Sequence, residues 1–217
     1  MAKGDLKKGL LLTLEGPEGC GKSTQSKLLA EYLAGLGYKC IQTREPGGTL
    51  LGEEIRQLLL DSGELRISSL SELLLFEAAR AAIVRDVISP ALDKKKIVIC
   101  DRFSDATFAY QGYAGGLGQE RIARIDSIVT GGLRPDATIL LDIETPLGLS
   151  RATKTGKDRM ERKPFDYHVR VRQGYLRLAK KYPKRIKVIK VDGSIDEVQA
   201  RIRREVDRVI KRYSRPG

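Results

Sequence analysis

Near its start the chain reads Gly16-Pro17-Glu18-Gly19-Cys20-Gly21-Lys22-Ser23, which matches the phosphate-binding pattern Gly-x-x-x-x-Gly-Lys-Ser/Thr. The apolar run Leu10–Glu15 before it predicts a buried strand, and Lys22–Leu36 after it predicts a helix that stops at Gly37. The loop therefore joins a strand to a helix N-terminus, where free N–H groups and the helix dipole favour an anion. A glycine-rich turn without a ligand is the weaker alternative.

Each part of this loop has a predicted task. Glycines let the backbone wrap phosphate groups without Cβ clashes. The Lys22 amine is expected to reach the β- and γ-phosphates of ATP and to act in catalysis, and the Ser23 hydroxyl is expected to bind Mg²⁺. The predicted ATP contacts are therefore Gly16, Pro17, Glu18, Gly19, Cys20, Gly21, Lys22, Ser23 and Thr24.

Strand-like and helix-like segments alternate along the 217 residues, which predicts one α/β domain with a parallel sheet covered on both faces. Helices are expected over Leu50–Leu60, over Ser71–Leu92 and after Ser194, where Glu197 completes a capping box. The segment Ser71–Leu92 is unusually apolar, so it is either a central core helix or a helix that also packs against a partner subunit. The strands are expected at Leu10–Glu15, Lys39–Thr43, Ile97–Cys100, Ala137–Asp142 and Ile186–Val191.

The composition predicts a soluble cytoplasmic protein. No apolar run approaches the ~18 residues of a membrane span, and the basic N-terminus leads into the phosphate loop, not into a signal-peptide cleavage site. The cysteines Cys20, Cys40 and Cys100 have no metal-type spacing and fit a reducing compartment. Cys20 is either a tolerated small residue or a thiol whose pKa the helix N-terminus lowers and which ATP protects from alkylation.

The net charge of +12 has two readings, nucleic-acid binding or small polyanionic ligands on a generally basic surface. The basic residues are scattered and no nucleic-acid reader motif is present. Nucleic acid is therefore not expected as the substrate.

Charged residues follow the predicted strands at the sheet edge where ligands of open α/β sheets bind. Asp101 is expected to hold Mg²⁺, with a surface salt bridge as the alternative. Arg44 and Arg102 are expected to grip the phosphate group of an acceptor and to neutralise charge in the transition state.

Two further features point to a second ligand and a closing segment. Phe76 and Arg80 lie four residues apart on one helix face, where a ring and a guanidinium suit a nucleobase, although core packing explains Phe76 as well. The segment 151–163 reads as a mobile lid over ATP, or as a solvated basic loop. Its basic residues are Arg151, Lys154, Lys157, Arg159, Arg162 and Lys163. No role is predicted for His168.

Together these residues resemble the thymidylate kinase family, in its bacterial form. The resemblance runs from about Gly9 to Tyr213 and is most specific in three motifs, Arg44-Glu45-Pro46-Gly47-Gly48, Phe76-x-x-x-Arg80, and Asp101-Arg102-Phe103 followed by Ala109-Tyr110-Gln111-Gly112. The other matching stretches are Arg134-Pro135-Asp136, Asp158-Arg159-Met160-Glu161 and Val191-Asp192-Gly193-Ser194.

The resemblance implies a five-stranded P-loop nucleoside monophosphate kinase fold with a mobile lid, and a cytoplasmic homodimer. Its reaction would be transfer of the γ-phosphoryl group of ATP, with Mg²⁺, to thymidine monophosphate in deoxynucleotide synthesis. Phe76 would stack on thymine and Arg80 would bond its edge. The remaining implied contacts are Arg44 and Arg102 on the acceptor phosphate, Glu18 near the sugar, Tyr110 and Gln111 beside the base and deoxyribose, and Gly193 by adenine.

Two departures from the family pattern shift the expectations. The phosphate loop lacks the arginine that some members carry, so the resemblance places the catalytic arginine in the lid, at Arg151 or Arg159. Ala106 stands where the family often has serine, which leaves open whether Thr107 supplies the hydroxyl.

Three rival functions remain at this point: another nucleotide or small-metabolite kinase on the same fold, a GTPase switch, and a nucleic-acid-binding ATPase. The GTPase reading fails on sequence, because Ser104 stands where Asp-x-x-Gly needs glycine and Thr153-Lys154 is not followed by x-Asp. A panel of acceptors separates the first rival, and stimulation by DNA or RNA separates the third.

Overall fold

A five-stranded parallel sheet in the order β2-β3-β1-β4-β5 forms the centre of the molecule. The computed structural model describes residues 6–60, 65–152 and 158–214. The strands are β1 (Leu10–Glu15), β2 (Cys40–Arg44), β3 (Ile97–Asp101), β4 (Ala137–Asp142) and β5 (Ile186–Lys190). The predicted sheet is thus confirmed, with strand ends that differ from the expected ones by no more than one residue.

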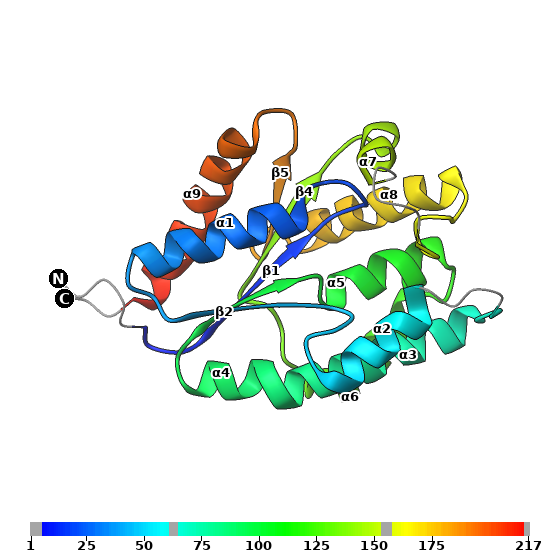
Figure 1. Cartoon of the computed structure of the whole chain (residues 1–217), viewed down its shortest axis with the longest axis horizontal. Coiled ribbons are helices and arrows are strands. Elements are labelled where there is room, and N and C mark those ends of the chain that lie inside the picture. The colour runs from blue at the N-terminus through cyan, green and yellow to red at the C-terminus, as the bar shows by residue number, and fades with distance from the viewer. Residues whose placement is uncertain (1–5, 61–64, 153–157, 215–217) are drawn as a thin grey trace.

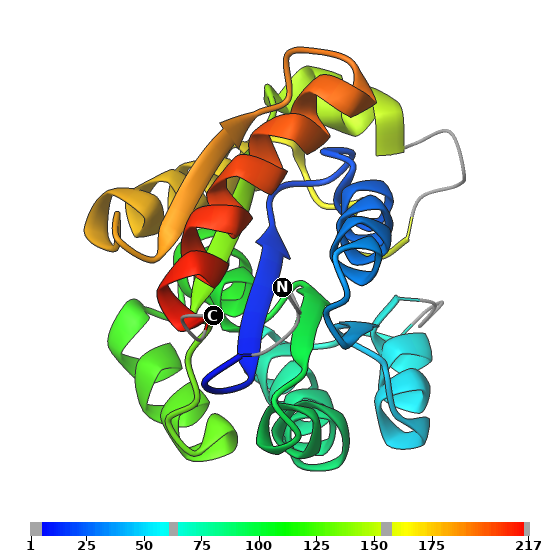
Figure 2. The ribbon, with the colours of Figure 1, turned by 90° about the vertical axis from the view of Figure 1, so that its left-hand side faces the viewer.

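Helices cover both faces of this sheet, as Figures 1 and 2 show. On one face α1 and α9 pack against each other and against the strands, while α4 and α8 pack on the other. This double cover explains why the residues of β1 are all buried and read as one apolar run. The helices are α1 (Lys22–Gly35), α2 (Leu50–Leu60), α3 (Ser69–Ile83), α4 (Ser89–Asp93), α5 (Ser104–Thr107), α6 (Gln119–Thr130), α7 (Thr145–Ala152), α8 (Phe165–Lys181) and α9 (Ile195–Tyr213), with π-helical turns η1 (Val84–Ile88) and η2 (Phe108–Ala114).

The apolar segment expected as one helix over Ser71–Leu92 is α3, η1 and α4 in sequence. It begins at Ser69 because the Ser68 hydroxyl caps it by accepting from the Ser71 N–H at 3.1 Å. Leu73 is fully buried, whereas Leu70 and Leu74 are 45% and 51% exposed. Core packing therefore accounts for only one side of α3.

The last helix, α9, carries the predicted capping box. The Ser194 hydroxyl accepts from the Glu197 N–H at 3.2 Å, and the Glu197 carboxylate accepts from the Ser194 N–H at 2.7 Å. At the other end of α9, Ser214 pairs with Leu6, so the first and last described residues lie side by side. None of the helices in the described part of the chain is long and apolar enough to cross a membrane.

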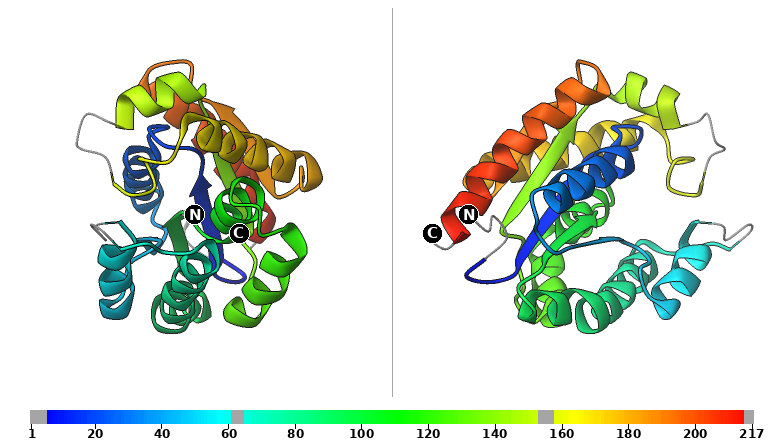
Figure 3. Two further views of the ribbon diagram at one scale, coloured as in Figure 1. Left: turned by 90° about the vertical axis from the view of Figure 1, so that its right-hand side faces the viewer. Right: turned by 60° about the vertical axis from the view of Figure 1, so that its left-hand side comes forward.

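The carboxyl ends of the strands open toward one side of the molecule. There α2 and α3 lie on one flank and α7 and the start of α8 on the other (Figures 1 and 3). This edge of the sheet carries the phosphate loop and the residues that follow β2 and β3.

Candidate active site

The phosphate loop at Gly16–Ser23 packs tightly on the end of β4 and on α7. A Cβ at Gly19, whose φ is +68°, would lie 1.9 Å from the Gly148 carbonyl oxygen, so only glycine fits there. Gly21 caps the N-terminus of α1 in the left-handed conformation. The first turn of α1 thus points its free N–H groups into the loop, as an anion site needs.

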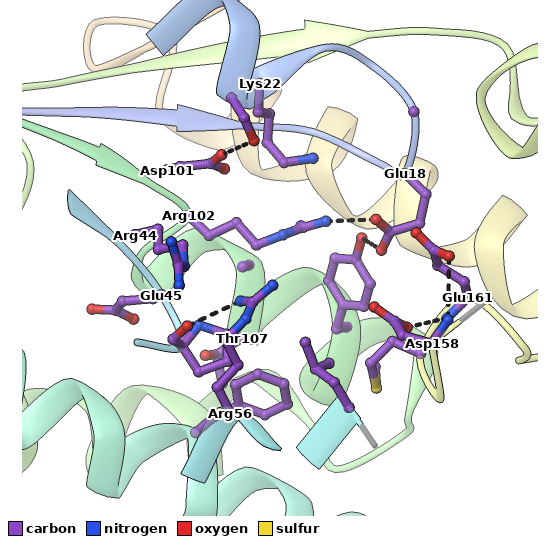
Figure 4. Close-up of a pocket in the computed structure, with 18 of the residues that line it drawn as sticks. Glu18, Lys22, Arg44, Glu45, Arg56, Asp101, Arg102, Thr107, Asp158 and Glu161 are labelled. Carbon is purple, nitrogen blue, oxygen red and sulfur yellow. Dashed lines mark hydrogen bonds and ion pairs between the residues drawn. The ribbon is translucent and has the colours of Figure 1, made fainter. Parts of the chain in front are cut away.

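The amine of Lys22 lies inside this loop. It donates to the carbonyl oxygens of Gly16 at 3.1 Å and Pro17 at 3.0 Å. Next to it, the Ser23 hydroxyl donates to the Asp101 carboxylate at 2.7 Å. Figure 4 shows Lys22 and Asp101 on the same side of the cavity, as the sequence predicts for a triphosphate and metal site.

Cys20 is 1% exposed, and burial raises the pKa of its thiol. The prediction that the helix N-terminus lowers this pKa is wrong, because desolvation of the thiolate outweighs the nearby Lys22 charge. Cys20 is a small buried side chain of the loop.

Arg102 crosses the cavity from the end of β3 toward the loop (Figure 4). Its φ of +68° is strained for a residue with a side chain. Its Nη2 donates to the Glu18 carboxylate at 2.9 Å, and the guanidinium stacks 4.9 Å above the Tyr110 ring. Glu18 also accepts from the Tyr110 hydroxyl at 2.6 Å. Burial opposes ionisation of Glu18, but Arg102, Lys22 and this hydrogen bond lower its pKa on balance.

Arg80 is 2% exposed and lies among carboxylates. Its Nε donates to Glu45 at 2.8 Å, and its Nη1 donates to Glu77 at 2.6 Å and to the Thr107 hydroxyl at 2.9 Å. Asp126 lies 3.6 Å from the same Nη1 and also pairs with Arg134. Burial, with the Glu77 and Asp126 carboxylates, raises the pKa of Glu45 to about 7 despite its bond to Arg80.

The π-helical turn η2 brings Tyr110 and Gln111 to the same cavity. The Gln111 amide donates to Glu72 at 2.9 Å, and Glu72 also pairs with Arg159 at 2.6 Å. Arg159 is held further by the Leu59 carbonyl oxygen at 2.7 Å. The structure therefore places Arg159 behind the cavity wall, while exposed Arg151 lines the cavity itself.

The cavity between these groups has a volume of about 550 Å³. It brings together most of the residues that the sequence predicts: Glu18, Gly19, Gly21, Lys22, Ser23, Thr24, Arg44, Phe76, Arg80, Asp101, Arg102, Thr107, Tyr110, Gln111 and Arg151. Gly193 does not line it and lies beside Glu197 at the start of α9. Lys154 and Lys157 lie outside the described residues.

Sequence reasoning missed Arg56 and named Asp158 and Glu161 only as part of a family motif, with no role in the site; all three line the cavity. Arg56 donates to the Pro46 carbonyl oxygen at 3.0 Å and faces the cavity beside Arg44 (Figure 4). Glu53 accepts from Arg44 at 2.9 Å, and Arg56 lies three residues after Glu53 on the same helix face. This spacing is the sequence signal that could have indicated Arg56.

Comparison with known proteins identifies the family to which this site belongs. The sequence pattern of the family described as "Thymidylate kinase" matches residues 14–202. The chain belongs to the thymidylate kinase family. It is 47% identical over 206 residues to the thymidylate kinase of Symbiobacterium thermophilum, covering 95% of this chain and 96% of that one. The thymidylate kinase of Deinococcus radiodurans is 45% identical over 198 residues, covering 91% and 96% of the two chains.

A solved structure supports the same family. The crystal structure of thymidylate kinase from Ehrlichia chaffeensis superposes with a TM-score of 0.74 at 38% identity, over 91% of this chain and 98% of that one. The family and the fold predicted from the sequence are therefore confirmed, and so is the enzyme class, an ATP-dependent nucleotide kinase.

Proposed function

We propose that this chain transfers the γ-phosphoryl group of ATP to thymidine monophosphate, forming thymidine diphosphate and ADP for deoxynucleotide synthesis. The observation that carries the proposal is that Lys22 of the phosphate loop and the base-site pair Phe76 and Arg80 open into one cavity. A donor and an acceptor bound there face each other without solvent between them. Family membership supports the choice of thymidine monophosphate.

The loop wall of the cavity would bind ATP. Backbone N–H groups of the loop and the Lys22 amine hold the phosphates. The Ser23 hydroxyl and Asp101 carboxylate, 2.7 Å apart, are hard oxygen ligands of the kind that Mg²⁺ prefers, so they fit this ion. Bound Mg²⁺ supplies positive charge to the phosphate oxygens.

The opposite wall would bind thymidine monophosphate. Half-buried Phe76 offers a ring face to thymine, and Arg80 offers its Nη2, which has no hydrogen bond to another described residue. The guanidinium groups of Arg44, Arg56 and Arg102 converge on the place of the acceptor phosphate. Tyr110, Gln111 and Glu18 border the nucleoside between these groups.

Catalysis in this proposal needs no strong general base, because the acceptor phosphate oxygen is already a nucleophile. The enzyme must instead screen two anions as they approach each other. Lys22 and Arg102 lie on either side of their meeting point, and Arg151 adds charge from the end of α7. We propose that the segment 151–163 is a lid of a single kinase domain and that it excludes water when it closes.

A coupled assay of ADP release across nucleoside monophosphates tests this function. We expect thymidine monophosphate to give the highest kcat/KM, with deoxyuridine monophosphate behind it because it lacks the methyl group that fills the pocket. A higher kcat/KM for a purine or cytidine monophosphate would contradict the proposal.

We further propose that the protein is a cytoplasmic homodimer that pairs through α3 and α6. These helices contact each other and expose Leu70, Leu74 and, at 82%, Ile128. Such a patch on neighbouring helices suits a second copy of the same chain. Light scattering should show a dimer that Ile128→Lys splits into monomers, while Leu147→Lys on α7 does not; a wild-type monomer at micromolar concentration would refute the dimer.

A further inference from the structure

Glu15, the last residue of β1, is fully buried next to the active site without lining the cavity. Its Oε1 accepts from the Phe103 N–H at 2.7 Å, and its Oε2 accepts from the Tyr175 hydroxyl at 2.7 Å. A buried carboxyl group is costly unless such bonds satisfy it. Glu15 therefore makes two defined contacts within the protein and does not line the cavity.

Both contacts of Glu15 lead to Arg102. Phe103 directly follows Arg102 in the chain, and the Tyr175 hydroxyl accepts from Arg102 Nη1 at 3.1 Å. The N–H of Arg102 donates to the Leu14 carbonyl oxygen at 3.0 Å, so β1 also holds the strained residue from its other side. A backbone conformation with φ at +68° persists only when its surroundings fix it in this way.

Each hydrogen bond between Arg102, Tyr175 and Glu15 has a defined donor and acceptor. A phenol has one proton to donate, and the Tyr175 proton goes to Glu15. The oxygen lone pairs of Tyr175 are then left facing Arg102, which has only donors. Without Glu15 as acceptor, the Tyr175 proton has no fixed partner and its hydroxyl is free to turn.

The contact between the Tyr175 hydroxyl and Arg102 has a consequence for a phosphate ligand. The Tyr175 hydroxyl holds Arg102 without carrying a charge, so it leaves the positive charge of the guanidinium available. Glu18, which bonds Nη2 at 2.9 Å, instead neutralises that charge. A bound phosphate dianion competes with Glu18 for the guanidinium but does not need to displace Tyr175.

We propose that Glu15 and Tyr175 are positioning residues that set the side chain of Arg102 for the acceptor phosphate. This inference rests on the proposed function, in which Arg102 binds that phosphate. It adds residues of β1 and α8 that never touch a substrate, and it gives the carboxyl group at the end of β1 a task in acceptor recognition.

The test compares binding of thymidine monophosphate with binding of thymidine, which lacks the phosphate, by isothermal titration calorimetry. Tyr175→Phe and Glu15→Gln should each weaken monophosphate binding roughly tenfold, the scale of a charge-assisted contact, and leave thymidine binding within about twofold. The KM for ATP should not change. Because both residues act through one chain of bonds, the double variant should be no weaker than the worse single variant.

Tyr167→Phe is the matched control. Tyr167 lies on the same helix, is buried like Tyr175 and packs edge-on against Tyr110 as Tyr175 does. Among the described residues, its hydroxyl donates a hydrogen bond only to the Tyr110 carbonyl oxygen, at 3.1 Å. It should leave the preference for monophosphate over thymidine within about twofold. If Glu15→Gln does not fold, as judged by its thermal transition, Tyr175→Phe decides the question alone.

Arg102→Lys separates failure of the inference from failure of the proposed function. If Arg102→Lys lowers the preference for monophosphate over thymidine and folded Tyr175→Phe does not, the positioning role is overturned and the function stands. If neither variant changes that preference, Arg102 does not bind the acceptor phosphate, and both the inference and that part of the proposed function fall.

Discussion

The two walls of the cavity hold their charged groups in different ways. On the loop wall, Lys22 bonds to the carbonyl oxygens of Gly16 and Pro17, so the backbone of one short stretch satisfies it. On the acceptor wall, Arg80 is satisfied by the side chains of Glu45 and Glu77, which come from different segments of the chain. The loop wall is thus local, and the acceptor wall is part of the protein core.

This difference predicts which functional residues also hold the fold together. Removing the Lys22 side chain, which bonds to two carbonyl oxygens and the Cys20 sulfur of its own loop, leaves groups that water can reach through the open cavity. Removing a buried counter-ion leaves uncompensated charges in the core, at a cost of several kcal/mol. Loop-wall variants should therefore lose activity alone, whereas acceptor-wall variants should lose stability and activity together.

Arg80→Ala tests the acceptor wall and should have the largest effect. Glu45, Glu77 and Asp126 would lose their shared guanidinium, which should lower the free energy of unfolding by about 3–5 kcal/mol. Urea denaturation measures this. Arg85→Ala is the control, since within the described part of the chain exposed Arg85 pairs only with exposed Asp86, and its loss should change stability little. An Arg80→Ala protein of normal stability would remove the distinction between the walls.

Lys22→Met tests the loop wall. It should lower kcat on the order of 10²-fold or more, because the amine stabilises charge that develops during transfer. Its urea midpoint should match that of the wild type. Lys27→Met, on the exposed side of the same helix, should leave kcat unchanged. Near-normal turnover of Lys22→Met would contradict the donor site.

The same difference explains what the sequence could predict. The loop wall is contiguous, so its residue spacing alone predicts the strand, the anion site and the roles of Lys22 and Ser23. The acceptor wall joins Arg44, Phe76, Arg80 and Arg102 from separate segments. Helical spacing paired Phe76 with Arg80 and strand ends paired Arg44 with Arg102, but only the family resemblance joined the two pairs before the structure did. Neither route found Arg56, because its spacing from Glu53 becomes informative only once Glu53 is known to hold Arg44.

Some features depend on contacts that no local pattern encodes. The sequence treats Arg151 and Arg159 as equal candidates, but the bonds of Arg159 to Glu72 and to the Leu59 carbonyl oxygen separate them. The raised pKa of Cys20 also follows from its burial, which outweighs the nearby positive charges of Lys22 and Arg102. In each case tertiary contacts decide between readings that the sequence leaves open.

Arg151→Ala and Arg159→Ala sharpen the comparison within the segment 151–163. Exposed Arg151 lines the cavity, so its loss should lower kcat about tenfold or more, the scale of one contact to a charged group, with stability unchanged. Arg159 is 14% exposed and pairs with Glu72, so its loss should lower the urea midpoint and affect kcat less. The reverse pattern, measured on the same two proteins, would move the catalytic arginine to Arg159.

Glu45→Gln should have the smallest effect on stability. It tests the ionisation of the closely spaced carboxylates on the acceptor wall. The pKa of Glu45 in the folded protein is about 7, above its ordinary value of 4.5, so the folded protein binds this proton more tightly than the unfolded chain. The resulting stability is complete below about pH 4.5 and is lost as the pH rises through about 7. Between pH 6 and pH 8 this loss should be about 1 kcal/mol.

Burial raises the pKa of Glu15 as well, although its hydrogen bonds from Tyr175 and the Phe103 N–H oppose this, so the wild-type protein should lose more stability over this range than Glu45 alone explains. The informative quantity is therefore the difference between the stability that the wild type loses over this pH range and the stability that Glu45→Gln loses. The amide oxygen of Glu45→Gln can still accept from Arg80. Urea denaturation at pH 6 and pH 8 should show a smaller loss for Glu45→Gln, and Glu31→Gln on the surface of α1 should match the wild type. Equal losses of stability for Glu45→Gln and wild type would mean that Arg80 keeps Glu45 ionised throughout this pH range. The single positive charge of Arg80 would then stabilise all the carboxylates around it.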